Sequence, residues 1–232
     1  DLQNAGNRMV LVSSGAIGVG VGKLGLAQRP HETEQKQAVA AVGQCELMFM
    51  YDKMFGEYNH TVAQVLLTRD VVENMHSKQN VVNTLNTLLS MGIIPVVNEN
   101  DTVAIDELVG SNFGDNDTLS AIVAGLVEAQ KLIILTDIDG LYDADPRKNP
   151  DAKRIPVVQQ VTPEVVALAG GSGSTRGTGG MLTKVHAAQT AIIKIERPTS
   201  MFIFSASLQL ISQDQQHEHR HRERRQQESV SA

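Results

Sequence analysis

Short apolar runs alternate along the chain with longer segments in which apolar residues recur every three or four positions. Runs that are apolar at nearly every position suit strands buried on both faces, and the three-to-four period suits helices. The predicted strands span residues 9–13, 62–67, 93–97 and 131–135, and the predicted helices span 33–55, 80–90, 117–129, 163–168 and 181–191. This alternation predicts an α/β fold, a three-layer αβα sandwich around an open, mainly parallel twisted sheet.

The helix expected over 33–55 carries a clear apolar period. Its apolar positions include Ala38, Ala41, Val42, Cys45 and Met48. This spacing predicts that they form one buried face. Cys45 is the chain's single cysteine, so an intrachain disulfide is excluded and a buried thiol is expected.

The two ends of the chain depart from this regular pattern. Residues 1–8 are predicted to be the end of a helix, with Gly6 and Asn7 as its stop signal. Residues 201–204 fit one more strand, and the Gln-, His-, Arg- and Glu-rich residues from 212 onward are expected to be disordered. We therefore expect a domain over residues 1–192 and a divergent polar tail over 193–232.

Composition and charge narrow the class of protein. The chain has 232 residues, of which 41% are apolar and 3% aromatic, enough for a substantial aliphatic core. A net charge of -6 argues against general nucleic-acid binding, which requires a basic surface. No apolar stretch approaches the roughly 20 residues of a membrane span, and no signal peptide is seen, so we expect a cytoplasmic protein.

Two polar motifs follow predicted strands. Ser14 opens a glycine-rich turn over 14–22, where backbone N–H groups and a hydroxyl can bind an anion; an ordinary strand-to-helix turn is the alternative. Residues 98–101, Asn-Glu-Asn-Asp, follow the strand over 93–97. Asn and Asp side chains there suit an ammonium group, although solvated turns are also polar.

A third motif, Gly-Asp-Asn-Asp over 114–117, lies at the start of a predicted helix. Asp117 is either a helix cap or a carboxylate that orients nearby lysines. A fourth, Asp-x-Asp-Gly over 137–140, resembles a phosphatase signature, but such phosphatases need a Thr where this chain has Leu141. The loop that continues over 143–147 suits a nucleobase and ribose.

The fifth motif, Gly-Thr-Gly-Gly-Met-Leu-Thr-Lys over 177–184, leads into a helix. Its glycines let the backbone approach phosphates, and the helix adds its positive end. Lys184 lies on the first turn, within reach of a transferring phosphoryl group. The motif is not a P-loop, because it lacks Gly-Lys-Ser/Thr, and a flexible surface loop is the alternative.

These five motifs, in this order, resemble the amino acid kinase family over residues 6–191, and within it the members that act on the side-chain carboxylate of glutamate. The resemblance implies that Lys184 and Asp117 are catalytic, with Asp117 organising the lysines. It implies that Ser14, Asp101 and Asn116 bind the substrate. The implied nucleotide contacts are Thr136, Asp137, Thr178, Gly179, Gly180, Met181, Leu182, Thr183 and Lys184.

The resemblance also implies a reaction and partners. We expect ATP-dependent phosphorylation of L-glutamate to L-glutamyl 5-phosphate, the first step of proline biosynthesis. Mg²⁺ would be bound with ATP, with no protein ligands identified for it. Proline is an expected feedback inhibitor, and a homodimer or homotetramer is the expected assembly.

The chain departs from the family at both ends. Family members begin with a lysine-bearing strand and a Gly-Ser-rich loop, which this sequence lacks, and the residues after Ala191 are divergent. Two alternatives therefore stay open. One is an inactive fragment that only binds ligand or oligomerises, and the other is a related kinase such as one acting on N-acetylglutamate.

Overall fold

The computed structural model describes residues 1–104, 116–169, 180–194 and 201–206. Its described strands form one sheet in the order β2-β3-β1-β5-β4, and every pairing is parallel. The strands are β1 (Arg8–Val12), β2 (Val62–Leu67), β3 (Ile94–Glu99), β4 (Lys131–Leu135) and β5 (Met201–Ala206). Because all five run in one direction, their carboxyl ends meet at a single edge of the sheet.

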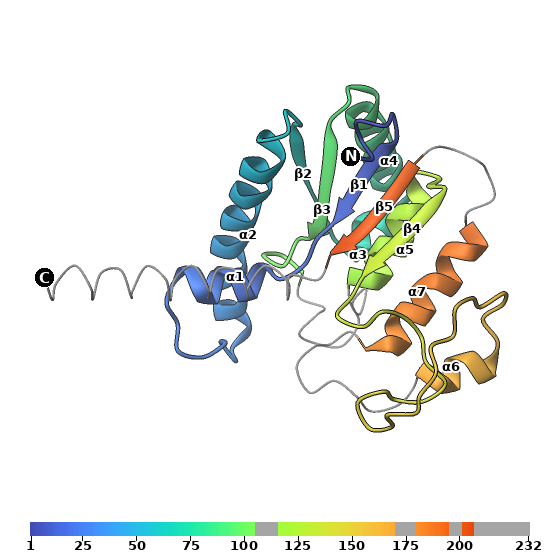
Figure 1. The fold of residues 1–232 in the computed structure, drawn as a ribbon. Helices are drawn as coiled ribbons and strands as arrows, with labels where there is room; N and C mark the ends of the chain where they lie inside the picture. The colour runs from blue at the N-terminus through green and yellow to red at the C-terminus, as the bar shows by residue number, and fades with distance from the viewer. Residues whose placement is uncertain (105–115, 170–179, 195–200, 207–232) are drawn as a thin grey trace, which may run out of the picture.

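Helices cover both faces of this sheet (Figure 1). They are α1 (Ala16–Lys23), α2 (Thr33–Gly56), α3 (Arg69–Glu73), α4 (Met75–Ser90), α5 (Asn116–Leu126), α6 (Pro163–Ala169) and α7 (Met181–Lys194). Val96 of β3 packs with α2, whereas its neighbour Val97 packs with α4 and α5. Successive residues of a strand thus contact opposite layers, which confirms the predicted three-layer α/β fold.

The predicted elements were mostly confirmed. The strands over 62–67 and 131–135 have the predicted bounds, and β5 confirms the strand expected near 201. The first residues form hydrogen-bonded turns rather than the predicted helix end, although Gly6 has the positive φ of 85° expected of a stop signal. None of the described helices combines the length and the apolar character that a membrane crossing requires.

The glycine-rich segment after β1 was wrongly predicted to be only a turn. It forms α1 from Ala16, and one of its glycines, Gly20, packs closely against α2. A Cβ atom on Gly43 of α2 would lie 1.7 Å from the backbone oxygen of Ala16, and one on Gly20 would lie 2.0 Å from that of Val39. Only glycine permits so close a crossing of α1 and α2.

Gly43→Ala is therefore expected to lower the free energy of unfolding by about 2–3 kcal/mol, because backbone atoms must move apart to admit the methyl group. Gly56→Ala, in the same helix with open space around it, is the matched control. It should be neutral or stabilising by about 0.5–1 kcal/mol. Urea denaturation measures both, and equal effects of the two substitutions would contradict the close crossing.

The predicted buried face of α2 was wrong. Ala38, Ala41, Val42 and Cys45 are exposed, and Met48 is only partly buried. The buried residues are Val39, Ala40, Gly43, Gln44, Leu47 and Tyr51. The helix is apolar on two sides, so its period could not show which side meets the sheet; the close approach at Gly43 selects it.

Candidate active site

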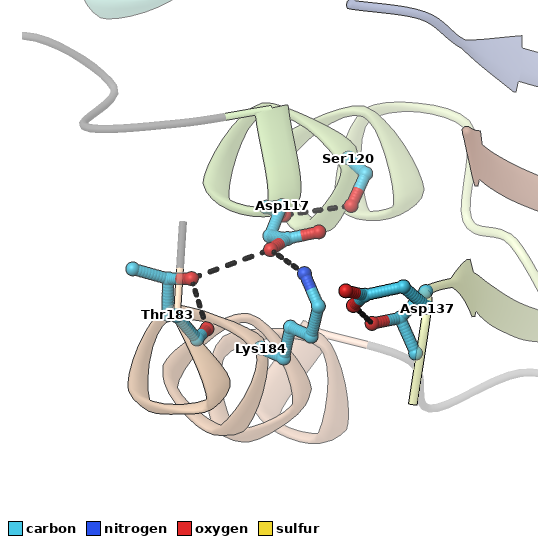
Figure 2. Close-up of polar contacts among 7 residues, drawn as sticks. Asp117, Ser120, Asp137, Thr183 and Lys184 are labelled. Atoms are coloured by element: carbon cyan, nitrogen blue, oxygen red, sulfur yellow. Dashed lines mark hydrogen bonds and ion pairs between the residues drawn. The ribbon is translucent and has the colours of Figure 1, made fainter. Parts of the chain in front are cut away.

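Asp117 and Lys184 form an ion pair between the first turns of α5 and α7. Lys184 Nζ donates to Asp117 Oδ2 at 2.8 Å, and the Thr183 hydroxyl lies 3.3 Å from the same oxygen (Figure 2). The Asp117 side chain is only 9% exposed and that of Lys184 only 16%. Water screens such a pair much less than a surface pair, so the carboxylate holds the ammonium group firmly in place.

The surroundings of this pair keep the two helix starts together. Ser120 Oγ donates to the backbone oxygen of Asp117 at 2.6 Å, and Thr183 Oγ1 donates to that of Gly180 at 2.7 Å. Farther along, α5 and α7 meet through the small side chains Ala121, Ala187 and Ala191. The positive ends of two helices and one fixed ammonium group thus lie at the same place, an arrangement suited to phosphate oxygens.

Thr136 and Asp137 follow β4 directly and lie near this pair. Figure 2 shows the Asp137 carboxylate pointing toward Lys184. Thr136 Oγ1 is 3.3 Å from Asp137 Oδ1, and Arg147 Nη2 donates to Asp137 Oδ2 at 3.1 Å. The Arg147 and Asp137 side chains are each more than half exposed, so their pair adds little to stability and is accessible to a ligand.

The loop after β4 is ordered by contacts within itself. Tyr142 pairs with Arg154 in an isolated antiparallel bridge, and Tyr142 Oη donates to Asp139 at 2.8 Å. That hydrogen bond to a carboxylate raises the pKa of the Tyr142 phenol. The loop was predicted to be rich in turns, and these contacts hold it in a compact arrangement at the carboxyl end of β4.

Farther along the same edge of the sheet, beyond β5, the strand β1 ends beside β3. Ser13 N donates to Val97 O at 2.8 Å, and the buried Ser13 hydroxyl lies 2.9 Å from Tyr51 Oη. Ser14 comes next and is partly buried, and Gly15 turns the chain with a φ of 91° into α1. Among the residues that the structure describes, no side chain caps the start of α1, so its first N–H groups remain suited to an anion.

The end of β3 is held by a buried amide pair. Asn98 Nδ2 donates to Gln44 Oε1 at 2.8 Å, and Asn98 Oδ1 accepts from the backbone N–H of Glu99 at 2.9 Å. Asn98 and Glu99 thus belong to the strand, where a polar turn was predicted, and Asp101 lies in the turn that follows. Sequence reasoning missed Gln44 and Tyr51, because α2 was oriented wrongly.

Tyr51→Phe is expected to lower the free energy of unfolding by about 1–2 kcal/mol, because it leaves the buried Ser13 hydroxyl without its partner. Burial also raises the pKa of the Tyr51 phenol, which stays protonated near neutral pH. Tyr58→Phe is the control, since Tyr58 is 72% exposed, and it should change stability by less than about 0.5 kcal/mol. Equal values in a urea titration would refute the role given to Tyr51.

Comparison with known proteins identifies the family of this chain. Residues 1–205 match the sequence profile of the amino acid kinase family. The chain belongs to the amino acid kinase family. The match spans the sheet, the Asp117–Lys184 pair and nearly all of β5.

Three proteins that are similar to this chain are named glutamate 5-kinase. Glutamate 5-kinase of Clostridium perfringens is 63% identical over 192 residues, 82% of this chain and 71% of the relative. Glutamate 5-kinase of Listeria innocua is 59% identical over 189 residues, 81% of this chain and 68% of the relative. Glutamate 5-kinase of Geobacter sulfurreducens is 53% identical over 191 residues, 82% of this chain and 50% of the relative.

The structure of this amino acid kinase brings several predicted site residues together. Asp117, Thr183, Lys184 and Gly180 are linked by hydrogen bonds, and Met181 and Leu182 complete the first turn of α7. Thr178 and Gly179 lie outside the described residues.

The predicted substrate residues lie at the same edge of the sheet. Ser14 follows β1 and Asp101 follows β3, which pair in parallel, and Asn116 opens α5 directly before Asp117. The predicted residues thus share one edge, as a common site requires.

Proposed function

We propose that this chain transfers the γ-phosphoryl group of ATP to the side-chain carboxylate of L-glutamate, giving L-glutamyl 5-phosphate and ADP. The buried Asp117–Lys184 pair carries the proposal. It fixes a positive charge where the starts of α5 and α7 meet, an arrangement that suits the phosphate oxygens of ATP. The identities of 63% and 53% to proteins named glutamate 5-kinase support the choice of substrate.

The chemistry requires little from the protein beyond placement and charge. A carboxylate oxygen of glutamate attacks the γ-phosphorus, the bond to the bridging oxygen of ADP breaks, and ADP leaves with that electron pair. The nucleophile is already an anion, so no general base is needed. Lys184 offsets the negative charge of the transferring group, and Asp117 keeps the lysine in position for it.

The two substrates would occupy neighbouring parts of the sheet edge. Ser14 and the open start of α1 suit a carboxylate of glutamate, and Asp101 and Asn116 suit its ammonium group. Thr136 and Asp137, after β4, and the segment 178–184 would hold ATP. Lys184 belongs to the nucleotide segment and faces Asp117 next to Asn116, so the transfer would take place there.

Magnesium fits this site as a partner of ATP. Within the described ranges, no group of three or more His, Cys, Asp or Glu side chains is arranged to hold a metal ion. Mg²⁺ commonly uses substrate phosphates with only one or two carboxylates, so the donor set is compatible with an ion held mainly by ATP. When bound, it would add positive charge at the phosphates.

We propose that this reaction is the first step of proline biosynthesis and that it takes place in the cytoplasm. Proline, which shares the α-carboxylate of glutamate and carries a secondary ammonium in place of the primary one, is the proposed feedback inhibitor at or near the substrate residues. The active domain would extend over residues 1–192, followed by the tail over 193–232.

Trapping with hydroxylamine tests the proposal. The protein should form glutamyl hydroxamate only with ATP, magnesium and L-glutamate all present. Faster reaction with N-acetylglutamate would overturn the choice of substrate. No hydroxamate above background from a folded protein would favour the inactive, ligand-binding alternative.

A further inference from the structure

Gln44 is a buried side chain of α2 that carries an unpaired hydrogen-bond donor. Only 8% of the residue is exposed, and its Oε1 accepts from Asn98 Nδ2 at 2.8 Å. Among the residues that the structure describes, Gln44 Nε2 has no hydrogen-bond partner. Buried polar atoms are nearly always paired, because an unpaired one loses its bonds to water without replacement. The free donor therefore indicates a place where a ligand supplies the acceptor.

The hydrogen bonds around Asn98 determine which atom of the Gln44 amide is free. The backbone N–H of Glu99 donates to Asn98 Oδ1 at 2.9 Å, and an N–H group can only donate. Asn98 must therefore present its Nδ2 to Gln44, and Gln44 must present the acceptor Oε1 in return. The free atom is Nε2, which has two N–H donors and cannot accept. It can bind an oxygen acceptor but not an ammonium group.

The free amide belongs to the part of α2 that touches the start of α1. A Cβ atom on Gly43, the residue before Gln44, would lie 1.7 Å from the backbone oxygen of Ala16, the first residue of α1. Figure 1 shows α1 crossing α2 on the side of the molecule where β1 and β3 end. The start of α1 has no capping side chain among the described residues. An uncapped helix start and a free amide donor thus lie close together, which suits an anion.

We propose that Gln44 Nε2 and the start of α1 together bind the α-carboxylate of the amino acid substrate. The proposal rests on the function given above, in which glutamate is the acceptor. The side-chain carboxylate that reacts must lie at Lys184, in the helix layer of α5 and α7. Gln44 belongs to α2, which packs on the opposite face of the sheet, so it meets the other carboxylate. A charged acceptor gains more from this donor than a neutral one, so the contact selects substrates with a free α-carboxylate.

Calorimetric titration of the whole chain with L-glutamate, without ATP, tests the contact. Gln44→Met keeps the length of the side chain but removes the donor, and it should raise the Kd about 10–100-fold, as expected for a hydrogen bond to a charged group. Gln35→Met, the same change at an exposed position of α2, is the control and should leave the Kd unchanged. Circular dichroism checks that each variant is folded. A folded Gln44→Met protein that binds L-glutamate as the wild type does would overturn the proposal.

A second variant, Gln44→Glu, separates this contact from the support that Gln44 gives to Asn98. It keeps an acceptor for Asn98 and replaces only the free donor with an oxygen. The titration is run at about pH 8.5, far above the usual pKa of a glutamate side chain. The variant should bind L-glutamate at least as weakly as Gln44→Met does, because two carboxylates would then meet. Normal binding would show that Gln44 acts only through Asn98, which would contradict the proposal.

L-Isoglutamine identifies the group that Gln44 contacts, because it has an amide in place of the α-carboxylate and keeps the side-chain carboxylate. The wild type should prefer L-glutamate, and Gln44→Met should reduce that preference by roughly fivefold or more. A preference that the substitution leaves unchanged would refute the assignment to the α-carboxylate. The expected binding pattern without any hydroxamate would overturn the kinase reaction and leave this site standing. A folded wild type that does not bind L-glutamate would overturn both.

Discussion

Lys184→Gln is expected to lower kcat by about 10²–10³-fold, by analogy with the loss of one preorganised donor at a developing charge. Glutamine keeps a donor for Asp117, which lies 2.8 Å from the lysine, but removes the positive charge. The loss should appear in kcat with little change in the KM for glutamate, because Lys184 acts on the transferring phosphoryl group rather than on the acceptor. Hydroxamate formation at saturating ATP measures it.

The control for this substitution is Lys78→Gln. Lys78 is exposed on α4 and has no place in the proposed site. Its removal makes the same change in net charge and should leave kcat unaltered. Equal rates for the Lys184 and Lys78 variants would show that Lys184 has no catalytic role.

Asp117→Asn is expected to reduce kcat by roughly 10²-fold and to lower the free energy of unfolding on the order of 3 kcal/mol, because it leaves a largely buried lysine without its counter-charge. Asparagine keeps the size of the side chain and one acceptor, so the effect isolates the charge. Asp151→Asn, in an exposed turn, is the control and should be neutral in both measurements.

A double variant tests whether the pair acts as a unit. If Asp117 works by holding Lys184, Asp117→Asn combined with Lys184→Gln should lose little more activity than Lys184→Gln alone. Losses that multiply would mean that Asp117 contributes independently of the lysine.

Much of the fold could be predicted because strands of a parallel sheet covered by helices appear in the sequence as short, mostly apolar runs. The strands over 62–67 and 131–135 were located to the residue in this way, although they are the edge strands and are only partly buried. Other elements depend on tertiary packing. The segment of α1 was interpreted as a turn because glycines disfavour a helix in isolation, and the need for Gly20 at the close approach to α2 cannot be seen in the sequence.

The orientation of α2 could not be predicted from its period. The helix carries apolar residues on two sides, and the close contact of Gly43 with Ala16 is one of the tertiary contacts that select the buried side. The same error hid Gln44 and Tyr51, two polar residues that position the ends of β3 and β1.

Within the site, the motifs gave the candidate residues but not their contacts. Asp117 was interpreted either as a cap or as an organiser of lysines, and its ion pair with Lys184, more than sixty residues away, favours the second. This ion pair forms because α5 and α7 pack together through alanines. A local sequence pattern does not show that two such distant helices are in contact. The domain boundary near residue 192 stays a prediction.

An oxygen-isotope experiment tests the central claim most directly. L-Glutamate carrying ¹⁸O in its side-chain carboxylate is incubated with ATP, magnesium and hydroxylamine, and the released inorganic phosphate is analysed by mass spectrometry. If the carboxylate attacks the γ-phosphorus, trapping breaks the carbon–oxygen bond and the phosphate carries one ¹⁸O atom. Phosphate without ¹⁸O would mean that water, not glutamate, accepts the phosphoryl group, and would contradict the proposed reaction.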